Sequence, residues 1–346
     1  MIEMRLYDKP FYQLLSGEKT VELRLNDEKR RGIAVGDIIR FSRKDQPSER
    51  LDMQVVALHK YPSFSKLFQT PLYEKCGCEN LTKEQAVEAM RTYYTSEQEE
   101  KWGVLGIEVE RFRHGKIFVT GDTHGANDFQ KLKLFAKRNP HLTKEDYLII
   151  AGDFGGLWFE DTLEEDLRPY CNLPFTVLFV DGNHENFNML NKYPTKRWNG
   201  GKVHFIKKDI IHLTRGQVFE ISGKKIFTMG GATSIDKEYR IPNISWWKQE
   251  EITYDDIQEA EQNLLRHDNI VDYIITHSCG ERALRALHPK LYNRPYKMKT
   301  QIDNLFLSKF EQTVDYARWY FGHYHLDTPV GYKCRALYQD IVEIGE

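Results

Sequence analysis

Residues 121–125 read GDTHG, and they follow the apolar run IFV at residues 117–119 after one threonine. The same arrangement occurs twice more, because GDFG at residues 152–155 and GNHE at residues 182–185 also follow apolar runs. An apolar strand, a glycine-containing polar loop and then a helical pattern are typical of a sheet buried between other layers. In such sheets, functional side chains gather in the loops at the carboxyl ends of the strands. The sequence therefore predicts an α+β fold whose polar loops meet at one edge of a sheet.

Two later motifs extend this set of polar strand ends. His277 follows the apolar run at residues 273–276, and GHYH at residues 322–325 follows another. A lone Asp-x-His pair would be interpreted as an ordinary polar loop, but an ordered series of such groups indicates a metal site. Carboxylate, amide and imidazole ligands together suit manganese, iron or zinc better than calcium or magnesium. The candidate ligands are Asp122, His124, Asp153, Asn183, His277, His323 and His325.

These motifs resemble the calcineurin-like metallophosphoesterase superfamily. Its pattern GDxH…GD…GNH[DE]…H…GHxH is matched in full between residues 115 and 346. The resemblance implies a four-layer αββα sandwich with a dinuclear metal centre between its two sheets. The metal expected first is manganese, with iron, zinc or nickel as alternatives.

The resemblance also implies a role for each residue. The expected ligands of one ion are Asp122, His124 and His325, and those of the other are Asn183, His277 and His323. Asp153 is expected to bridge the two ions and so to hold them close together against their repulsion. His184 is implied to be the histidine that binds no metal and protonates the leaving oxygen.

One motif departs from a branch of this superfamily. In phosphoserine/threonine phosphatases the second motif resembles GDxxDRG, whereas here residues 152–158 read GDFGGLW. The chain therefore lacks the arginine that grips phosphate and the aspartate that orients the catalytic histidine in those enzymes. Protein phosphatase activity is not expected, and His184 has no orienting partner that the sequence can identify.

A candidate substrate loop runs from residue 230 to residue 247. Arg240 could grip a phosphate, and Trp246 and Trp247 could stack on bases. The alternative, which we favour because tryptophan is highly buried on average, is that the tryptophans are core residues and Arg240 lies on the surface. Trp158 is interpreted in the same way.

The first 112 residues are expected to form a separate domain. Residues 17–24 read GEKTVELR, which matches Gly-x-Lys-x-x-Glu-x-Arg, and VGD follows at residues 35–37. This segment resembles the ASCH domain, a relative of the PUA RNA-binding barrel. The resemblance implies a small PUA-like β-barrel and a cleft, suited to a nucleotide or RNA segment, with Lys19, Glu22 and Arg24 at its floor. Without the resemblance, the same segment would be interpreted as a solvated hairpin edge of mixed charge.

Local signals in this domain predict several elements. Asp8 is expected to cap a helix that has Pro10 in its first turn, runs to Leu15 and is closed by Gly17, and Thr82 with Gln85 forms a capping-box signature. Strands are expected at residues 37–42, 51–59 and 104–109. Some ASCH proteins hydrolyse acetylated cytidine with a lysine and a threonine three positions later. Glu22 occupies that later position here, so this activity is not expected.

Composition sets wider limits. The chain has 346 residues, 40% of them hydrophobic and 29% charged, and its net charge of −2 gives no strong field for nucleic acid or membrane. No apolar stretch is long enough to span a bilayer, and no secretory signal is visible. The five cysteines are an odd number, which argues against disulfide partners and for the cytoplasm. Cys76 and Cys78 are expected to be packed thiols, with a redox or metal element as the alternative.

These observations predict a two-metal phosphoesterase. We expect it to hydrolyse a phosphomonoester or phosphodiester in a nucleotide or nucleic acid, guided by the ASCH domain. One alternative is an RNA-associated binding protein with a vestigial phosphoesterase fold. Another is a phosphoesterase that the ASCH domain regulates by sensing a nucleoside. The expected partner is a phosphate-ester substrate, and no membrane association is expected.

Overall fold

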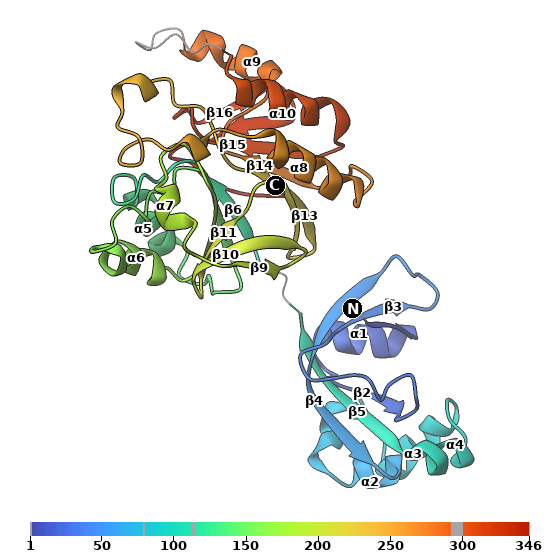
Figure 1. Cartoon of the computed structure of the whole chain (residues 1–346). Helices are drawn as coiled ribbons and strands as arrows, with labels where there is room; N and C mark the ends of the chain where they lie inside the picture. Colours follow the sequence, from blue (N-terminus) through green and yellow to red (C-terminus); the bar gives the residue numbers. More distant parts are fainter. Residues whose placement is uncertain (1, 79, 113–114, 292–299, 346) are drawn as a thin grey trace. The chain divides into compact units, whose positions relative to one another are not determined.

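The computed structural model describes residues 2–78, 80–112, 115–291 and 300–345 (Figure 1). The chain divides into two compact units, residues 1–113 and 114–346. All five cysteines are free thiols. Among the described residues, no helix combines the length and apolar character that a membrane span requires.

A curled half-barrel of five strands forms the N-terminal unit, in the order β1-β3-β4-β5-β2 (Figure 1). Strands β1 and β3 are parallel, and the other neighbours are antiparallel. Its elements are β1 (Ile2–Leu6), α1 (Asp8–Ser16), β2 (Val21–Leu25), β3 (Ile38–Arg43), β4 (Arg50–Tyr61), α2 (Phe64–Phe68), the 3₁₀ helix η1 (Pro71–Lys75), α3 (Lys83–Arg91), α4 (Ser96–Trp102) and β5 (Val104–Arg111).

The helix-capping predictions for this unit have different outcomes. The capping box of Thr82 and Gln85 is confirmed, and Gly17 ends α1 in the left-handed region at φ +81°. The prediction that Asp8 caps α1 is wrong, because Tyr7 is the N-cap residue and Asp8 lies in the first turn. The Asp8 carboxylate instead accepts a hydrogen bond from Nε of Arg43 at 2.9 Å.

Two sheets form the centre of the C-terminal unit, in the strand orders β18-β6-β7-β8-β11-β10-β9 and β12-β13-β14-β15-β17-β16. The first sheet and its helices comprise β6 (Ile117–Thr120), α5 (Gln130–Arg138), β7 (Tyr147–Ala151), α6 (Leu163–Cys171), β8 (Thr176–Val180), α7 (Phe187–Leu190), β9 (Thr195–Trp198), β10 (Gly201–Lys207), β11 (Ile210–Leu213) and β18 (Ile341–Glu343). The second comprises β12 (Gln217–Ile221), β13 (Lys224–Met229), η2 (Lys237–Tyr239), η3 (Lys248–Glu250), α8 (Tyr254–Leu265), β14 (Tyr273–Thr276), α9 (Glu281–Leu291), α10 (Ile302–Thr313), β15 (Arg318–Phe321), β16 (Thr328–Val330) and β17 (Cys334–Ala336).

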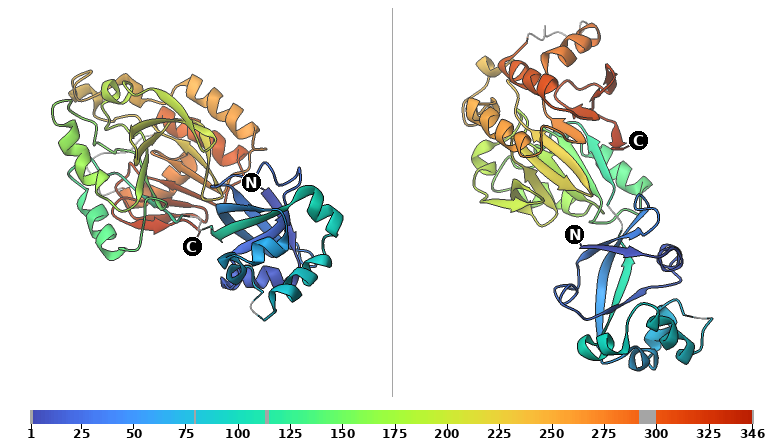
Figure 2. Two further views of the ribbon diagram at one scale, coloured as in Figure 1. Left: turned by 90° about the horizontal axis from the view of Figure 1, so that it is seen from below. Right: turned by 90° about the vertical axis from the view of Figure 1, so that its right-hand side faces the viewer.

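Three apolar cores separate four layers. Along β7, Leu148 and Ile150 pack toward the helices of the first sheet, whereas Ile149 and Ala151 pack between the sheets. Because successive side chains of a strand point to opposite faces, each sheet is buried on both sides. Helices α5 and α6 cover the outer face of one sheet, and α8, α9 and α10 cover that of the other (Figures 1 and 2). The predicted four-layer αββα architecture is confirmed.

The strand directions bring the motif loops together. Strands β6, β7 and β8 are parallel neighbours, and so are β13, β14 and β15. Parallel neighbours end at the same edge of a sheet, so the loops that follow them lie side by side. The two layers therefore present GDTHG, GDFG and GNHE from one sheet, and His277 and GHYH from the other.

Candidate metal centre

Carboxylate and imidazole groups converge where these loops meet. Three groups of side chains have potential ligand atoms within 4.8 Å of one another. Their members are Asp122, His124 and His325; His124, Asp153 and His184; and Asp122, Asp153 and His277. Residues more than 150 positions apart in the sequence thus form one buried polar cluster between the sheets.

His277 lies at the middle of this cluster and is fully buried. Its Nδ1 lies 2.8 Å from the carbonyl oxygen of Ala151, which fixes the ring with Nδ1–H as the donor. Its Nε2 therefore faces Oδ1 of Asp153 at 3.3 Å and Oδ1 of Asn183 at 3.0 Å. Burial lowers the pKa of His277, but the charges of Asp153 and Asp122 and the hydrogen bonds to Asp153 and Ala151 together outweigh burial and raise the pKa to about 10.

The other predicted ligands lie around His277 and Asp153. Nε2 of His325 lies 3.0 Å from Oδ2 of Asp122, and Nε2 of His124 lies 3.4 Å from Oδ2 of Asp153. The backbone N–H of His323 donates to Oδ1 of Asp122 at 2.9 Å. Burial, with a contribution from the charge of His277, lowers the pKa of the His323 imidazole to about 3.

The backbone of the ligand loops is strained. His124, Asp153, His323 and His325 have φ values of +43°, +48°, +64° and +49°. L-residues with side chains rarely adopt this left-handed region, and such strain persists mainly where function requires a particular geometry. The loops therefore hold these side chains in place at a cost in conformational energy.

The motif glycines are needed because side-chain atoms of the cluster approach their backbone. A Cβ atom on Gly322 would lie 2.2 Å from Oδ1 of Asp122, and one on Gly182 would lie 2.0 Å from Oδ1 of Asp153. A Cβ atom on Gly152 would lie 2.0 Å from Nδ1 of His277. Each glycine thus makes room for one carboxylate or imidazole of the cluster.

Several supporting residues were not identified from the sequence. Nδ1 of His124 lies 2.8 Å from Oδ2 of Asp128, whose other oxygen accepts from Tyr338 at 3.0 Å. The ring of Tyr338 stacks on His325, with centroids 4.5 Å apart. Lys131 donates to the carbonyl oxygen of Asp122 at 2.7 Å, and burial lowers the pKa of its ammonium group to about 8. Only Asp128, four residues after His124, has a spacing that could have indicated its role.

The glutamate of GNHE also supports the cluster through the GDFG loop. Glu185 is buried and accepts hydrogen bonds from the backbone N–H groups of Phe154 at 2.6 Å and Gly155 at 3.2 Å. Burial, and then the charge of Asp153, raise the pKa of the Glu185 carboxyl to about 8. It therefore connects the GNHE loop to the GDFG loop that carries Asp153.

His184 has a partner that the sequence did not reveal. Nη1 of Arg240 lies 3.0 Å from Nδ1 of His184, and Nη2 lies 3.5 Å from Nε2. Nε of Arg240 donates to Asp236 at 2.7 Å, which fixes the guanidinium group. Arg240 thus contacts the candidate centre, in contrast to the surface position that we favoured.

The tryptophans follow the favoured interpretation in part. Trp247 is buried, and its ring meets that of Trp158 edge to face at a centroid distance of 5.4 Å. Trp158 and Trp246 are only partly buried. Trp158 lines a cavity beside His124.

In the N-terminal unit, the three predicted cleft residues meet. Nζ of Lys19 lies 2.7 Å from Oε2 of Glu22, and Nη2 of Arg24 lies 2.9 Å from Oε1. Lys19 precedes β2, so the turn directs its side chain to the same side as Glu22 and Arg24. All three line a cavity of about 460 Å³, together with Cys76 and Cys78. Burial raises the pKa of the Cys76 thiol to about 12, which fits a packed thiol.

Comparisons with known proteins follow the same division of the chain. A model of the calcineurin-like phosphoesterase family matches residues 115–327, and a model of the ASCH domain matches residues 4–113. The comparison with curated proteins gave no match.

Similar solved structures cover different parts of the chain. The hypothetical protein PH0355 is 34% identical over 32% of this chain and 97% of its own, with a TM-score of 0.29. Protein PF0455 from Pyrococcus furiosus is 32% identical over 32% of this chain and 97% of its own, with a TM-score of 0.26. The phosphopantetheinyl hydrolase PptH from Mycobacterium tuberculosis is 15% identical over 65% of this chain and 90% of its own, with a TM-score of 0.34.

The family model that matches residues 115–327 spans more than half of the chain and includes every motif of the buried polar cluster. The chain therefore belongs to the calcineurin-like phosphoesterase family and carries an N-terminal ASCH domain.

Proposed function

We propose that the C-terminal unit is a dinuclear-metal phosphoesterase that hydrolyses a phosphomonoester or phosphodiester in a nucleotide or nucleic acid. The observation that supports this best is that side chains from the two sheets meet at Nε2 of His277. Asp153 and Asn183 come from one sheet, and His277 comes from the other.

The donor atoms fit a pair of divalent cations. His277 and His124 each use Nδ1 for a fixed hydrogen bond, to Ala151 and Asp128 respectively. Nε2 of each ring faces a carboxylate oxygen of Asp153, at 3.3 and 3.4 Å. A lone pair that faces a carboxylate is unfavourable unless a proton or a cation lies between them. The fixed Nδ1 partners are those that orient metal-binding histidines in proteins.

The assignment of ligands follows this geometry. We assign one ion to Asp122, His124 and His325 and the other to Asn183, His277 and His323. Asp153 is the proposed bridge, because its two oxygens face Nε2 atoms from both groups. Mixed nitrogen and oxygen ligands favour manganese, with iron, zinc or nickel as alternatives. When bound, such a pair supplies an acidified water and neutralises charge on the phosphoryl oxygens.

The chain's own groups complete the reaction. Arg240 donates to Nδ1 of His184, so the proton of the neutral ring is assigned to Nε2. We propose that His184 delivers a proton toward the leaving oxygen and that Arg240 both orients His184 and contacts a phosphoryl oxygen. This arrangement differs from the aspartate that orients the histidine in protein phosphatases.

For the N-terminal unit we propose a role in guiding the substrate. Its cavity of about 460 Å³ is lined by the cationic side chains of Arg5, Lys9, Lys19, Arg24, Arg30 and Lys44. Tyr93 and Tyr94 add aromatic surface to the same cavity. Cations beside aromatic rings suit a nucleotide or a single-stranded RNA segment. The same cavity supports the alternative that this unit senses a nucleoside and regulates the phosphoesterase.

The test is metal content and hydrolysis of bis-p-nitrophenyl phosphate with manganese, on the wild-type chain and on Asp153→Asn. We expect two ions per chain and turnover in the wild type, and loss of both in the variant. Wild-type protein that stays metal-free and inert with manganese supplied would contradict the proposal and favour a vestigial fold. RNA and nucleoside binding by the full chain and by Arg24→Ala separate guidance from sensing. Loss of RNA binding in the variant favours guidance, and loss of nucleoside binding favours sensing.

A further inference from the structure

A cavity of about 510 Å³ opens directly beside the candidate metal centre. Its wall begins at His124 and Gly155, in the loops that carry the predicted ligands. From there it continues along α6, past Thr162, Glu165 and Asp166. A group bonded to a phosphate at the centre would therefore enter this cavity.

The wall of this cavity is aromatic. Phe129, Trp158, Phe159 and Tyr170 all line it. Phe159 is 62% exposed, which is unusual for a phenylalanine and leaves its ring free to be covered by a ligand. The other rings are fixed, since Trp158 packs against the buried Trp247 and Phe129 packs against Tyr170. Such a wall offers stacking surface for a planar group.

The charge of the wall is negative. Glu165 and Asp166 contribute carboxylates, and Thr162 donates to Asp166 at 2.6 Å. None of the described residues that line this cavity is a lysine or an arginine. A second phosphate would be repelled here, whereas a group with N–H donors would find acceptors.

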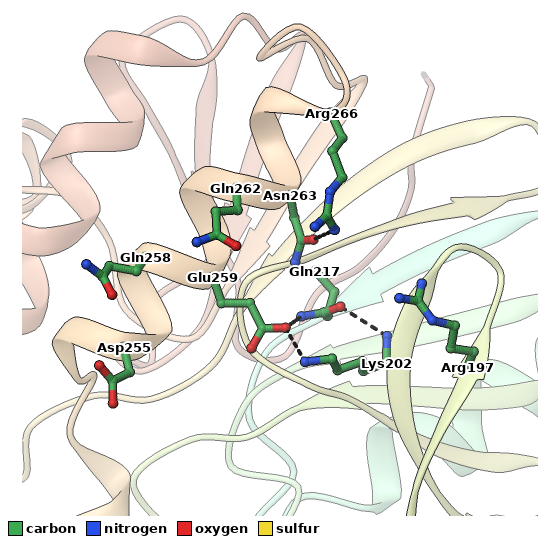
Figure 3. A pocket seen from close by; sticks show the side chains of 9 residues that line it. All are labelled: Arg197, Lys202, Gln217, Asp255, Gln258, Glu259, Gln262, Asn263 and Arg266. Carbon is green, nitrogen blue, oxygen red and sulfur yellow. Dashed lines mark hydrogen bonds and ion pairs between the residues drawn. The ribbon is translucent and has the colours of Figure 1, made fainter.

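Another cavity on the same unit lacks these properties. The cavity between α8 and strands β10 and β12, of about 400 Å³, is lined by charged and amide side chains (Figure 3). There Lys202 and Gln217 are both bound to Glu259, at 2.6 and 2.8 Å, so that charges are compensated within the wall. This second cavity offers no comparable preference for a ligand.

We propose that the cavity of Trp158 and Phe159 binds the base of a nucleoside whose phosphate ester lies at the metal centre. It selects bases with an exocyclic amino group, such as cytosine and adenine, because Glu165 and Asp166 accept from that group. This inference rests on the proposed function and narrows its substrate to esters of amino-bearing nucleosides.

The test uses the full chain and unphosphorylated cytidine and uridine, with binding measured by calorimetry. Cytidine is expected to bind the wild type more tightly than uridine. Phe159→Ala is expected to weaken cytidine binding about tenfold, the effect of losing one stacked ring. Glu165→Gln is expected to reduce the preference for cytidine over uridine. Tyr332→Ala is the control, because Tyr332 is 96% exposed and does not line this cavity.

Each outcome separates this inference from the proposed function. Cytidine binding that Phe159→Ala leaves unchanged would place the nucleoside elsewhere and overturn the inference. Equal binding of cytidine and uridine to the wild type would overturn the preference for an amino group. A chain that hydrolyses bis-p-nitrophenyl phosphate but binds neither nucleoside contradicts only the inference. A chain that binds cytidine as expected but hydrolyses no ester contradicts only the proposed function.

Discussion

Nη1 of Arg240 lies 3.0 Å from Nδ1 of His184, so an arginine rather than a carboxylate holds this imidazole. Burial lowers the pKa of His184, and the Arg240 charge lowers it further against the opposing charge of Asp153. An arginine only donates hydrogen bonds, and its shorter contact is the one from Nη1 to Nδ1, which favours the neutral ring with its proton on Nε2. The loop of residues 236–245 thus sets the state of a side chain more than 50 positions away in the sequence.

Arg240→Ala is expected to lower kcat/KM for the phosphoester by about 10- to 100-fold, because one charged hydrogen bond to His184 is lost. Metal content should stay at the wild-type level, since Arg240 is not among the proposed ligands. Steady-state kinetics and metal analysis on the same preparation check both points. Arg266→Ala, at the exposed arginine that follows α8 as its C-cap residue, is the matched control. Unchanged kinetics in Arg240→Ala would contradict the proposed role of Arg240 in orienting His184 and binding phosphate.

Gly322→Ala is expected to misplace the proposed metal ligand Asp122 and to destabilise the C-terminal unit. The added Cβ would lie 2.2 Å from Oδ1 of Asp122 and 2.5 Å from the carbonyl oxygen of Ala151, so both the carboxylate and the backbone must move. A shift of about 1 Å in a catalytic site costs roughly 100-fold in rate, and we expect a loss of that order. Gly32→Ala is the control, because a Cβ there meets no atom within 4 Å. Wild-type activity in Gly322→Ala would show that Asp122 does not need its observed position.

Asp128→Asn tests whether Asp128 supports a ligand. It removes the carboxylate that lies 2.8 Å from Nδ1 of His124. Loss of such a partner typically weakens metal binding about 10- to 100-fold. Titration with manganese, compared with the exposed-site variant Asp161→Asn, measures the effect. Equal affinities of the two variants would argue that the hydrogen bond is not part of metal binding.

Glu22→Gln is expected to change the acid sensitivity of the N-terminal unit. Burial raises the pKa of Glu22, but the charges of Lys19 and Arg24 outweigh it, so the pKa lies below its ordinary value of 4.5. A depressed folded-state pKa contributes stability that is present above the unfolded value and lost as the pH falls through the folded value. The protection of the β2 amides against hydrogen exchange, measured relative to the intrinsic exchange rate at each pH, should therefore fall below about pH 4.5 in the full chain.

In Glu22→Gln, this loss of protection in acid should be smaller, and protection at pH 7 should already be lower because Lys19 and Arg24 lose their charged buried partner. Glu18→Gln, at an exposed glutamate of the same segment, is the control. An identical pH profile in wild type and Glu22→Gln would contradict the assignment.

Local sequence patterns predicted the parts of the fold that depend on short-range chemistry. Apolar runs that end in GDTHG, GDFG and GNHE indicated strands of a buried sheet, and Thr82 with Gln85 indicated the start of α3. Asp8 was misassigned because its carboxylate pairs with Arg43, 35 residues away, which no local pattern reveals. The short helix α2, Phe64–Phe68, was missed because its five residues are too few for a helical period.

For the candidate site, the sequence predicted the types of side chain but not the contacts that distant loops make with them. The ligand types follow from motifs because the coordinating groups must be carboxylates, amides or imidazoles at strand ends. The contacts of Arg240, Tyr338 and Lys131 could not be predicted, since each depends on how distant loops pack around the cluster. Long-range packing of this kind has no signature in one sequence.

The most direct test of the proposed dinuclear metal centre is a crystal structure of the manganese-loaded chain with anomalous scattering recorded at the metal edge. We expect two anomalous peaks about 3.5–4 Å apart with Asp153 between them. One should lie beside Asp122, His124 and His325, and the other beside Asn183, His277 and His323. No peak within coordination distance of these side chains, or a single peak that Asp153 does not touch, would contradict the proposed centre.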